Sequence, residues 1–548
     1  MATPLVLSPL LLMGMEYRCV FCILLISIYW IAEVVPIGVS SLLPLLLFPI
    51  LGIVSAKDIA ENYFKDSIVL FMCTLVLAIS VEETGLHRRI ALKLLTSVGS
   101  RKQTMLLGYM STAAFISFFV SDTAATALML PIAVAIVTTI SRVTDTAKST
   151  VHRTIDHVEG SNNNSDNKEA SNIDEKEFCD LVEEMNEENR GFAKAIVLAA
   201  SHGSLIGGTA IITSTGPNLV FREQLQTFYP HDEVSVSYLQ WMTFAMPPMF
   251  LYLLASFLVL SIFFLGPSSL IKWFKKRTDE EKHVSAVISK NLSTAYHDLG
   301  KISFAEVSVM AWFTVLFLLW VFRKPGFMAG WGNLFPDNGA MLTDSTCGIL
   351  IVFMLFVWPR ENPFDAEAEY EPILNWKIMK MKYSWSCQLL IAAGYAISEG
   401  VQKSGLSILI SCTMKGIFQN LQHVWLQLAV TSSICFMTEF ASNVSTGSIF
   451  IPIVISVAES FHMNPLYLAL PTAVACSFAF MLPMATPPNA IVYDTKIVSM
   501  FDMICTGFCL NLMCIAITVF NMNTYTFWLF DMSHVPHVPS RQNVTLAC

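Results

Sequence analysis

The stretch Ser442-Asn443-Val444-Ser445-Thr446 lies between two apolar runs, residues 425–440 and 449–457. A second polar cluster, Ser121-Asp122-Thr123, lies in the same way between apolar residues 105–120 and 124–140. A helix needs about 20 residues to cross a bilayer core of roughly 30 Å, so each apolar half is short for a span. The pattern predicts two helical hairpins that enter the membrane and turn back at the polar clusters. Because non-helical backbone at membrane depth must be buried in protein or line a cavity, we expect a polar site between the two tips.

The composition is that of a membrane protein. Of the 548 residues, 54% are hydrophobic and 14% are charged, whereas soluble proteins carry about 25% charged residues. Much of the acid behind the net charge of −9 lies in one loop, so nucleic acid is not an expected partner. Cys19 and Cys22 lie inside an apolar run and are interpreted as small buried hydrophobes. We predict an all-α polytopic membrane protein with about 11 transmembrane helices.

Basic residues predict the orientation, because loops rich in Lys and Arg face the cytosol. Residues 84–104 are basic, so the first hairpin is expected to enter from the cytosolic side. Residues 272–301 hold seven Lys and Arg residues and are also expected in the cytosol. Residues 141–190 are rich in Asn, Asp, Glu and Lys and are predicted to be disordered.

An internal repeat supports this organisation. Each hairpin is followed by an interrupted helix that contains a Pro-Asn pair, Pro217-Asn218 and Pro488-Asn489. Asn218 lies 96 positions after Asp122, and Asn489 lies 46 positions after Asn443. The difference, 50, is the length of the polar segment 141–190, so the two halves otherwise keep the same spacing. With the hairpins entering from opposite sides, this is an inverted repeat with a site at its interface, the layout of a secondary transporter.

The polar residues of the repeat suit an anion and a sodium ion. An anion site uses hydroxyls, amides and backbone N–H groups, often at helix N-termini, and sodium needs oxygen ligands. For any single residue the alternative stays open that small residues only let membrane helices pack closely. The residues expected to supply anion donors are Ser121, Thr123, Ser442, Asn443, Ser445, Thr446 and Thr486.

Other polar residues in the apolar runs have more than one interpretation. An ionisable group inside the membrane is by default a functional candidate. We interpret Glu33 and Glu399 as structural, leave Glu439 open, and expect His202 to be a packing residue with its hydrogen bonds satisfied. The chain lacks the metalloprotease, phosphate-loop and nucleophile-elbow motifs, so we do not expect an enzyme.

Residues 476–492, Cys-Ser-Phe-Ala-Phe-Met-Leu-Pro-Met-Ala-Thr-Pro-Pro-Asn-Ala-Ile-Val, resemble the signature of the divalent anion/sodium symporter family, which in animals carries di- and tricarboxylates and sulfate. The two hairpin tips resemble the family's paired Ser-Asn-Thr motifs. Residues 87–92, His-Arg-Arg-Ile-Ala-Leu, and residues 29–36, Tyr-Trp-Ile-Ala-Glu-Val-Val-Pro, also match the family in place. The resemblance runs from about residue 16 to the C-terminal tail.

The resemblance implies a homodimer in which a mobile transport domain moves like an elevator against a scaffold domain. It implies no cofactor besides sodium as the coupling ion, and a multi-pass protein of the plasma membrane with glycosylation at Asn543. The implied substrate-binding residues are Ser121, Asp122, Thr123, Ser442, Asn443, Val444, Thr486 and Pro487. The implied sodium-binding residues are Ser117, Ser121, Asp122, Ser214, Thr438, Ala441, Asn443 and Ala485.

The resemblance and the residue pattern together predict a division of the chain. The expected parts are N-terminal scaffold helices (1–83), a cytosolic interfacial segment (84–104), the first re-entrant hairpin (105–140), the disordered cytosolic loop (141–190), an unwound helix and outer loop (191–240), scaffold helices and loops (241–385), transport-domain helices with the second hairpin (386–460), a second unwound helix (461–500), the last transmembrane helix (501–528) and an extracellular tail (529–548).

The substrate class follows from the first interrupted helix. Gly207-Gly208-Thr209-Ala210 and Thr215-Gly216-Pro217-Asn218 resemble the carboxylate-transporting branch, so succinate-like dicarboxylates or citrate are expected. Sulfate or another divalent anion is the second candidate, and a cation-independent carboxylate exchanger is a further one. A membrane sensor that binds an anion without transporting it is the alternative from a different class.

Two departures of the chain from the family pattern lie where the family builds its first sodium site. The first tip has Asp122 in place of Asn, and Ser214 stands where the family has Gly. Elsewhere, Val444 replaces the hydroxyl residue of the second tip, and the first apolar run is short. An ionised Asp122 would hold a cation but repel a carboxylate, by about 4 kcal/mol at 4 Å and an effective dielectric of 20. A protonated Asp122 would instead donate a hydrogen bond. We therefore expect altered ion coupling, with fewer sodium ions, a proton or no cation.

Overall fold

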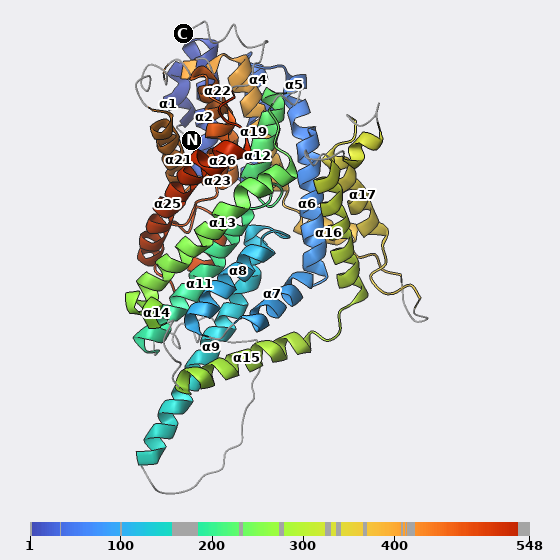
Figure 1. The fold of residues 1–548 in the computed structure, drawn as a ribbon. Helices are drawn as coiled ribbons and strands as arrows, with labels where there is room; N and C mark the ends of the chain where they lie inside the picture. Colours follow the sequence, from blue (N-terminus) through green and yellow to red (C-terminus); the bar gives the residue numbers. More distant parts are fainter. Residues whose placement is uncertain are drawn as a thin grey trace.

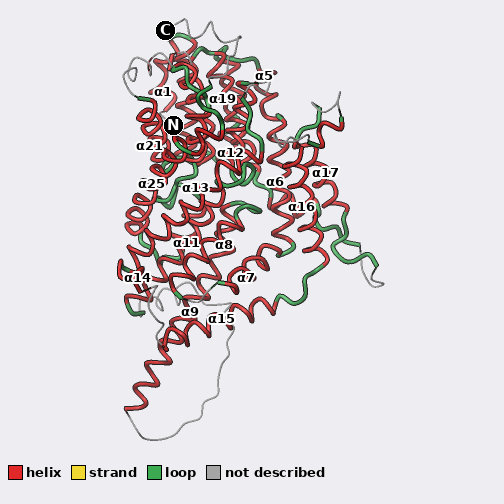
Figure 2. Tube along the Cα trace, in the orientation of Figure 1, coloured by secondary structure: helices red, strands yellow, loops and turns green. Residues whose placement is uncertain are grey.

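The described part of the chain is mostly helical, with loops and turns between the helices (Figure 2). It contains no β-strand, and its one pairing of extended backbone is an isolated bridge between Pro359 and Pro372. The expected all-α class is therefore confirmed. The computed structural model describes residues 3–32, 34–98, 101–155, 185–229, 234–272, 279–323, 330–335, 341–364, 370–406, 409–410, 413 and 422–534.

Figure 1 shows the helices coloured in chain order. Those of the first half are α1 (Thr3–Leu7), α2 (Met15–Ala32), α3 (Ile37–Ser40), α4 (Leu43–Ile50), α5 (Ala56–Glu61), α6 (Asp66–Glu83), α7 (Leu86–Ser97), α8 (Lys102–Ile116), α9 (Asp122–Ile155), α11 (Glu187–Gly208), α12 (Gly216–Phe228), α13 (Tyr238–Leu260) and α14 (Pro267–Lys272). Those of the second half are α15 (Asp279–Asp298), α16 (Phe304–Arg323), α17 (Asp344–Val357), α18 (Trp376–Lys382), α19 (Trp385–Lys403), α21 (His423–Met437), α22 (Asn443–Ser460), α23 (Leu466–Ala475), α24 (Pro487–Asp494), α25 (Met500–Asn523) and α26 (Tyr525–Leu529).

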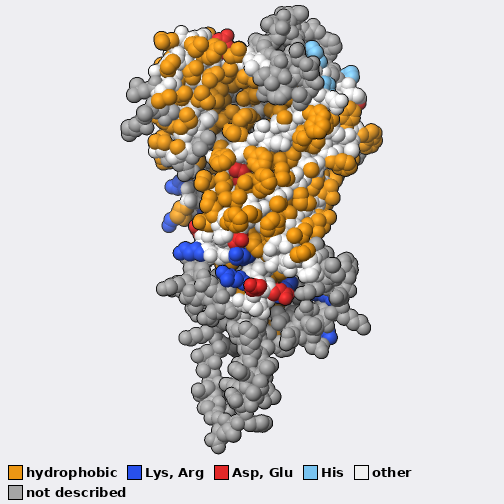
Figure 3. Space-filling view, turned by 90° about the vertical axis from the view of Figure 1, so that its left-hand side faces the viewer, with side chains coloured by type: hydrophobic (Ala, Val, Ile, Leu, Met, Phe, Trp, Pro, Cys, Tyr) orange, Lys and Arg blue, Asp and Glu red, His pale blue; other side chains and the backbone are white. Residues whose placement is uncertain are grey.

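Several helices have the length and apolar character of membrane spans. On the face shown in Figure 3, hydrophobic side chains cover most of the surface, and most of the visible Lys and Arg side chains lie along its lower margin. This distribution fits a protein whose middle lies in lipid. Within the described residues, six helical stretches are long and apolar enough to cross a membrane: Ala56–Glu83, Asp122–Ser141, Tyr238–Leu265, Phe304–Arg323, Asn443–Ser460 and Met500–Leu529.

Two groups of helices pack closely, and the second contains the hairpin of the first repeat. α6, α16 and α17 pack together on one side of the molecule, and α8, α9 and α11 pack together beside them (Figure 1). The contact between α8 and α11 is close because Gly207 has no side chain. A Cβ atom at Gly207 would lie 2.3 Å from the carbonyl oxygen of Ala114, so a larger residue would push the helices apart.

The prediction that 141–190 is disordered is wrong for both ends of this stretch, because α9 continues to Ile155 and α11 begins at Glu187; residues 156–184 lie outside the described residues. In the second repeat α23 ends at Ala475. Apolar composition permits a longer helix here, and contacts described below hold residues 479–482 in another conformation.

Candidate functional site

Two helix–turn–helix units carry the polar clusters at their turns. Residues 117–121 join α8 to α9, and residues 438–442 join α21 to α22. The side-chain oxygens of Ser121 and Ser442 each accept a hydrogen bond, at 3.3 Å, from the N–H group three residues later. Serine is favoured at this position because it satisfies a free N–H group of the first helical turn. The turns were expected to centre on the clusters, but in both units the cluster begins at the helix cap and continues into the helix.

Two interrupted helices follow the same repeat. Residues 209–215 separate α11 from α12, and residues 476–486 separate α23 from α24. The last residue of each segment is a threonine in nearly the same extended conformation: Thr215 has φ −142° and ψ 151°, and Thr486 has φ −148° and ψ 148°. Prolines in the first turn of both second helices fit there because this turn leaves N–H groups unbonded.

The repeated asparagines hold the interrupted segments in the same way. Asn218 donates from Nδ2 to the carbonyl oxygens ten and seven residues before it, at 3.2 and 3.0 Å. Asn489 donates to the carbonyl oxygens at the same two separations, at 2.8 and 3.1 Å. Each asparagine thus replaces hydrogen bonds that a continuous helix would have made. The acceptors are Gly208 and Ile211 in the first segment and Ala479 and Leu482 in the second.

The two halves are packed against each other across the site. α22 packs on α12, and α9 packs on α24, so each hairpin contacts the interrupted helix of the other repeat. The contact at Gly216 is close, since a Cβ atom there would lie 2.4 Å from a methyl carbon of Val444. The side chain of Ser201 on α11 also hydrogen bonds the amide oxygen of Asn489. The helices that begin at the two polar clusters thus pack on the interrupted helices of the opposite repeats.

Four hydroxyl groups in this region are buried without a hydrogen-bond partner in the described structure. They are those of Ser117, Thr446, Ser477 and Thr486. A buried hydroxyl without a partner costs free energy, so a cluster of them is expected where a polar ligand binds. Ser117 and Thr486 are among the residues that the sequence predicted for sodium and for substrate.

The two tip residues Asp122 and Asn443 differ in their surroundings. The Asn443 amide oxygen accepts from the hydroxyl of Thr438 at 3.0 Å, and that hydroxyl is also 2.8 Å from the carbonyl oxygen of Cys476. The Asp122 carboxylate accepts from the N–H of Thr123 at 2.7 Å. No Lys or Arg in the described part of the chain forms an ion pair with Asp122.

Glu439 is buried and holds the second interrupted segment. Its carboxylate accepts hydrogen bonds from three consecutive N–H groups of that segment at 2.9–3.1 Å, and from Nδ2 of Asn511 at 2.7 Å. Of the two interpretations left open for Glu439, the contacts give it a structural role. The sequence contained no signal for Asn511, which lies on α25, or for Ser201. The three N–H groups belong to Phe480, Met481 and Leu482.

The other ionisable candidates are placed as follows. Glu399 hydrogen bonds Asn62 and forms an ion pair with Lys403 at 2.7 Å, which agrees with a structural role. His202 packs against Phe480, but only its Nδ1 is hydrogen bonded, so the expectation that it is satisfied holds for one nitrogen. Glu33 and the glycosylation candidate Asn543 lie outside the described residues.

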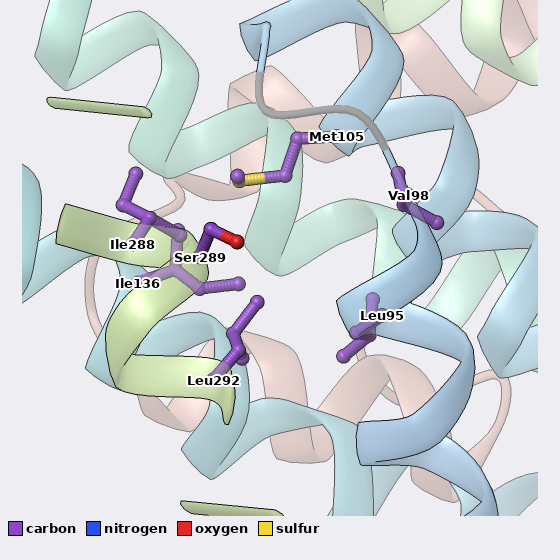
Figure 4. A pocket seen from close by; sticks show the side chains of 7 residues that line it. All are labelled: Leu95, Val98, Met105, Ile136, Ile288, Ser289 and Leu292. Atoms are coloured by element: carbon purple, nitrogen blue, oxygen red, sulfur yellow. The ribbon is translucent and has the colours of Figure 1, made fainter. Parts of the chain in front are cut away.

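Figure 4 shows a pocket elsewhere in the molecule, between α7, α9 and α15. Its lining is apolar except for one serine hydroxyl, so it offers no charge to an anion or a cation. The pocket is not the site predicted by the repeat. It is lined by Leu95, Val98, Met105, Ile136, Ile288, Ser289 and Leu292.

Comparison with known proteins gives the family. The model of the "Sodium:sulfate symporter transmembrane region" matches residues 2–532. The chain belongs to the sodium:sulfate symporter family. The resemblance seen in residues 476–492 is thereby confirmed, and the chain is a membrane transporter rather than an enzyme.

Curated members of the symporter family resemble the chain over nearly its whole length. "Sodium-dependent high-affinity dicarboxylate transporter 2" of Caenorhabditis elegans is 56% identical, over 97% of this chain and 94% of its own. "Na(+)/dicarboxylate cotransporter 3" of Homo sapiens is 36% identical, covering 97% and 92%, and "Na(+)/citrate cotransporter" of Rattus norvegicus is 34% identical, covering 97% and 95%. The crystal structure of the YdaH transporter of Alcanivorax borkumensis is similar in fold, with a TM-score of 0.51 over 86% of this chain and 87% of that one at 12% identity.

Proposed function

We propose that the protein is a secondary active transporter that carries di- or tricarboxylates, of the succinate or citrate kind, together with sodium. The observation that carries this proposal is the meeting of two capped helix turns and two interrupted helices around buried, unpartnered hydroxyl groups. Membership of the symporter family and the names of its curated relatives support the same substrate class and coupling ion.

Each predicted residue receives a role in this proposal. The substrate carboxylates bind the hydroxyls and the helix N-termini of both repeats, where N–H groups favour negative charge. The residues that bind substrate are Ser121, Asp122, Thr123, Ser442, Asn443, Val444, Thr486 and Pro487. Sodium binds oxygen atoms of Ser117, Ser121, Asp122, Ser214, Thr438, Ala441, Asn443 and Ala485. The two alanines contribute backbone carbonyls because their side chains have no oxygen, and Ser214 does so because its hydroxyl donates to nearby backbone carbonyl oxygens.

The unpaired carboxylate of Asp122 supports the sodium part of the proposal. A carboxylate inside a membrane protein is costly unless a positive charge lies near it. A sodium ion bound beside Asp122 would supply that charge and would also remove its repulsion of an anionic substrate. Binding of the cation and the substrate is then coupled through this one side chain.

We extend the proposal to the larger architecture of the family. The two helix–turn–helix units are re-entrant hairpins, and the domain containing them moves like an elevator against a scaffold in each protomer of a homodimer. The protein resides in the plasma membrane with Asn543 glycosylated outside the cell. These features rest on the resemblance and on the repeat, and cross-linking between the units and α6 in two conformations is the way to test the movement.

Uptake of radiolabelled succinate and citrate by cells that express the chain tests the proposed function. We expect uptake that depends on sodium and is lost when choline replaces it. Uptake that persists in choline would instead indicate a cation-independent exchanger. Absence of uptake, with the protein present at the cell surface, would favour sulfate, which the same assay measures with labelled sulfate, and then an anion sensor.

The variant Asp122→Asn gives the first tip the Ser-Asn pair of the second and tests the role of the carboxylate. We expect the half-saturating sodium concentration to rise by roughly tenfold, since a charged ligand is replaced by a neutral one. Unchanged dependence on both sodium and pH would show that Asp122 does not take part in coupling.

A further inference from the structure

The two interrupted segments share the asparagine contacts and the extended threonine but differ in the hydrogen bonding of their carbonyl groups. The hydroxyl of Ser214 lies 2.8 Å from the Gly208 oxygen and 2.7 Å from the Ile211 oxygen, and both oxygens already accept from Asn218. The residue at the same place in the second repeat is Ala485, whose methyl group cannot donate. One serine therefore distinguishes the first segment from the second.

This difference changes how much electron density the carbonyl oxygens can offer to a ligand. A carbonyl oxygen has two lone pairs. At Gly208 both can be occupied, one by Asn218 and one by Ser214. At the equivalent Ala479, the described contacts are limited to the single bond from Asn489, at 2.8 Å. The second segment thus keeps an acceptor that the first has lost whenever the serine hydroxyl points to Gly208.

The first repeat carries a negative charge where the second is neutral. Asp122 occupies the position of Asn443, and its turn contacts the first segment: the Ser117 hydroxyl lies 3.7 Å from where a Cβ atom of Gly208 would be. That hydroxyl is fully buried and has no partner in the described structure. A hydroxyl without a partner in the described structure therefore lies in the turn beside Gly208, and the charged Asp122 begins the helix that follows this turn.

We propose that Ser214 sets the affinity of the first repeat for the coupling cation by donating its one hydroxyl hydrogen to the Gly208 or the Ile211 carbonyl oxygen, and that Asp122 compensates with its charge. On this proposal the cation is bound by a carboxylate in the first repeat and by a neutral carbonyl group in the second. The inference rests on the proposed sodium-coupled function. Sodium is the cation concerned, because a small hard cation takes oxygen ligands of both kinds.

A reciprocal exchange between the repeats tests the role of Ser214. Ser214→Ala should leave both carbonyls without the serine donor and lower the half-saturating sodium concentration of succinate uptake by roughly threefold, the size of one net hydrogen bond. Ala485→Ser should raise it by a similar factor. Ser433→Ala is the matched control, because that hydroxyl donates to a carbonyl of its own helix at 2.8 Å on an exposed face of α21.

The direction in which Ser214→Ala shifts the half-saturating sodium concentration distinguishes this proposal from direct binding of sodium by the Ser214 hydroxyl. If the Ser214 oxygen itself bound sodium, Ser214→Ala would raise the half-saturating concentration, and this result would overturn the proposal. Equal values for wild type, Ser214→Ala and Ala485→Ser would overturn it as well. Sodium-dependent thermal stabilisation of the purified variants, compared with potassium, gives the same readout for any variant that folds but transports slowly.

The double variant Asp122→Asn/Ser214→Ala tests the compensation. We expect the second change to recover a larger factor of sodium affinity in the Asp122→Asn background than in the wild type, because the freed carbonyl becomes more important there. Equal factors in the two backgrounds would show that the residues act separately. If wild-type uptake itself ignores sodium, the proposed function fails; if it needs sodium and the exchanges have no effect, only this inference fails.

Discussion

The two repeats have the same caps and asparagine contacts but differ in the other polar side chains that bind their backbone. The serine caps, the extended threonines and the asparagine contacts are the same in both, with matching separations along the chain. Glu439 holds the second segment with four donors, whereas its counterpart Phe118 has no polar group to offer. The comparison teaches that the caps and asparagines build the frame, and that neighbouring side chains decide how firmly each half is held and what it binds.

The largest effect is expected from Glu439→Ala, which removes from the second repeat the carboxylate that the first repeat lacks. Three backbone N–H groups and Asn511 would lose their acceptor, which costs about 3 kcal/mol or more. We expect strongly reduced thermal stability in detergent and little uptake. Phe118→Leu, the matched change in the first repeat, should have a small effect. Equal effects of the two variants would contradict the special role of Glu439, and a cycle with Asn511→Ala measures the coupling directly.

The repeated asparagines should also differ in their cost. Asn489→Ala removes two donors to carbonyls and the partner of Ser201, whereas Asn218→Ala removes only the two donors, because the Asn218 oxygen has no partner in the described structure. We expect both variants to be destabilised, Asn489→Ala by about 1 kcal/mol more. Thermal denaturation compares them, and a larger loss for Asn218→Ala would contradict the difference in contacts.

The contact between α12 and α22 predicts a steric effect. Gly216→Ala would place its methyl group 2.4 Å from Val444 and should cost about 1–3 kcal/mol and reduce uptake. Val444→Ala in the same chain should restore part of the loss. Gly447→Ala is the control across the same interface, since its new methyl group would lie 3.4 Å from Pro217. Loss of function in the control alone would show that the packing is different.

The smallest effect concerns the hydroxyls of the two turns. Thr438→Val keeps the shape but removes the bonds to Asn443 and Cys476, so a loss of about 1 kcal/mol in stability is expected.

Ser117→Ala removes a hydroxyl without a partner in the described structure and should leave stability unchanged. Its expected effect is a higher half-saturating sodium concentration. The proposed sodium role of Ser117 would be wrong if uptake and sodium dependence both stayed unchanged.

The sequence by itself determined the helical class, the membrane location, the repeat and the family. These depend on local or repeated signals: apolar runs, serines that cap helices, prolines that fit first turns, and Pro-Asn pairs at matching spacing. Such signals act over a few residues and can be read in order. The same reasoning identified Asp122 and Ser214 as departures, because each breaks a pattern at a known position.

Only the tertiary structure decided where α23 ends, what Glu439 does and which carbonyls Ser214 occupies. Residues 476–482 are apolar enough to continue the helix, yet a carboxylate on a different segment and an asparagine further along bind their backbone groups instead. Ser201 becomes part of the site by contacting Asn489, which is 288 positions away, and Asn511 by contacting Glu439, which is 72 positions away. Contacts of that separation leave no periodic trace in the sequence, because they depend on how the packed helices bring distant backbone groups together.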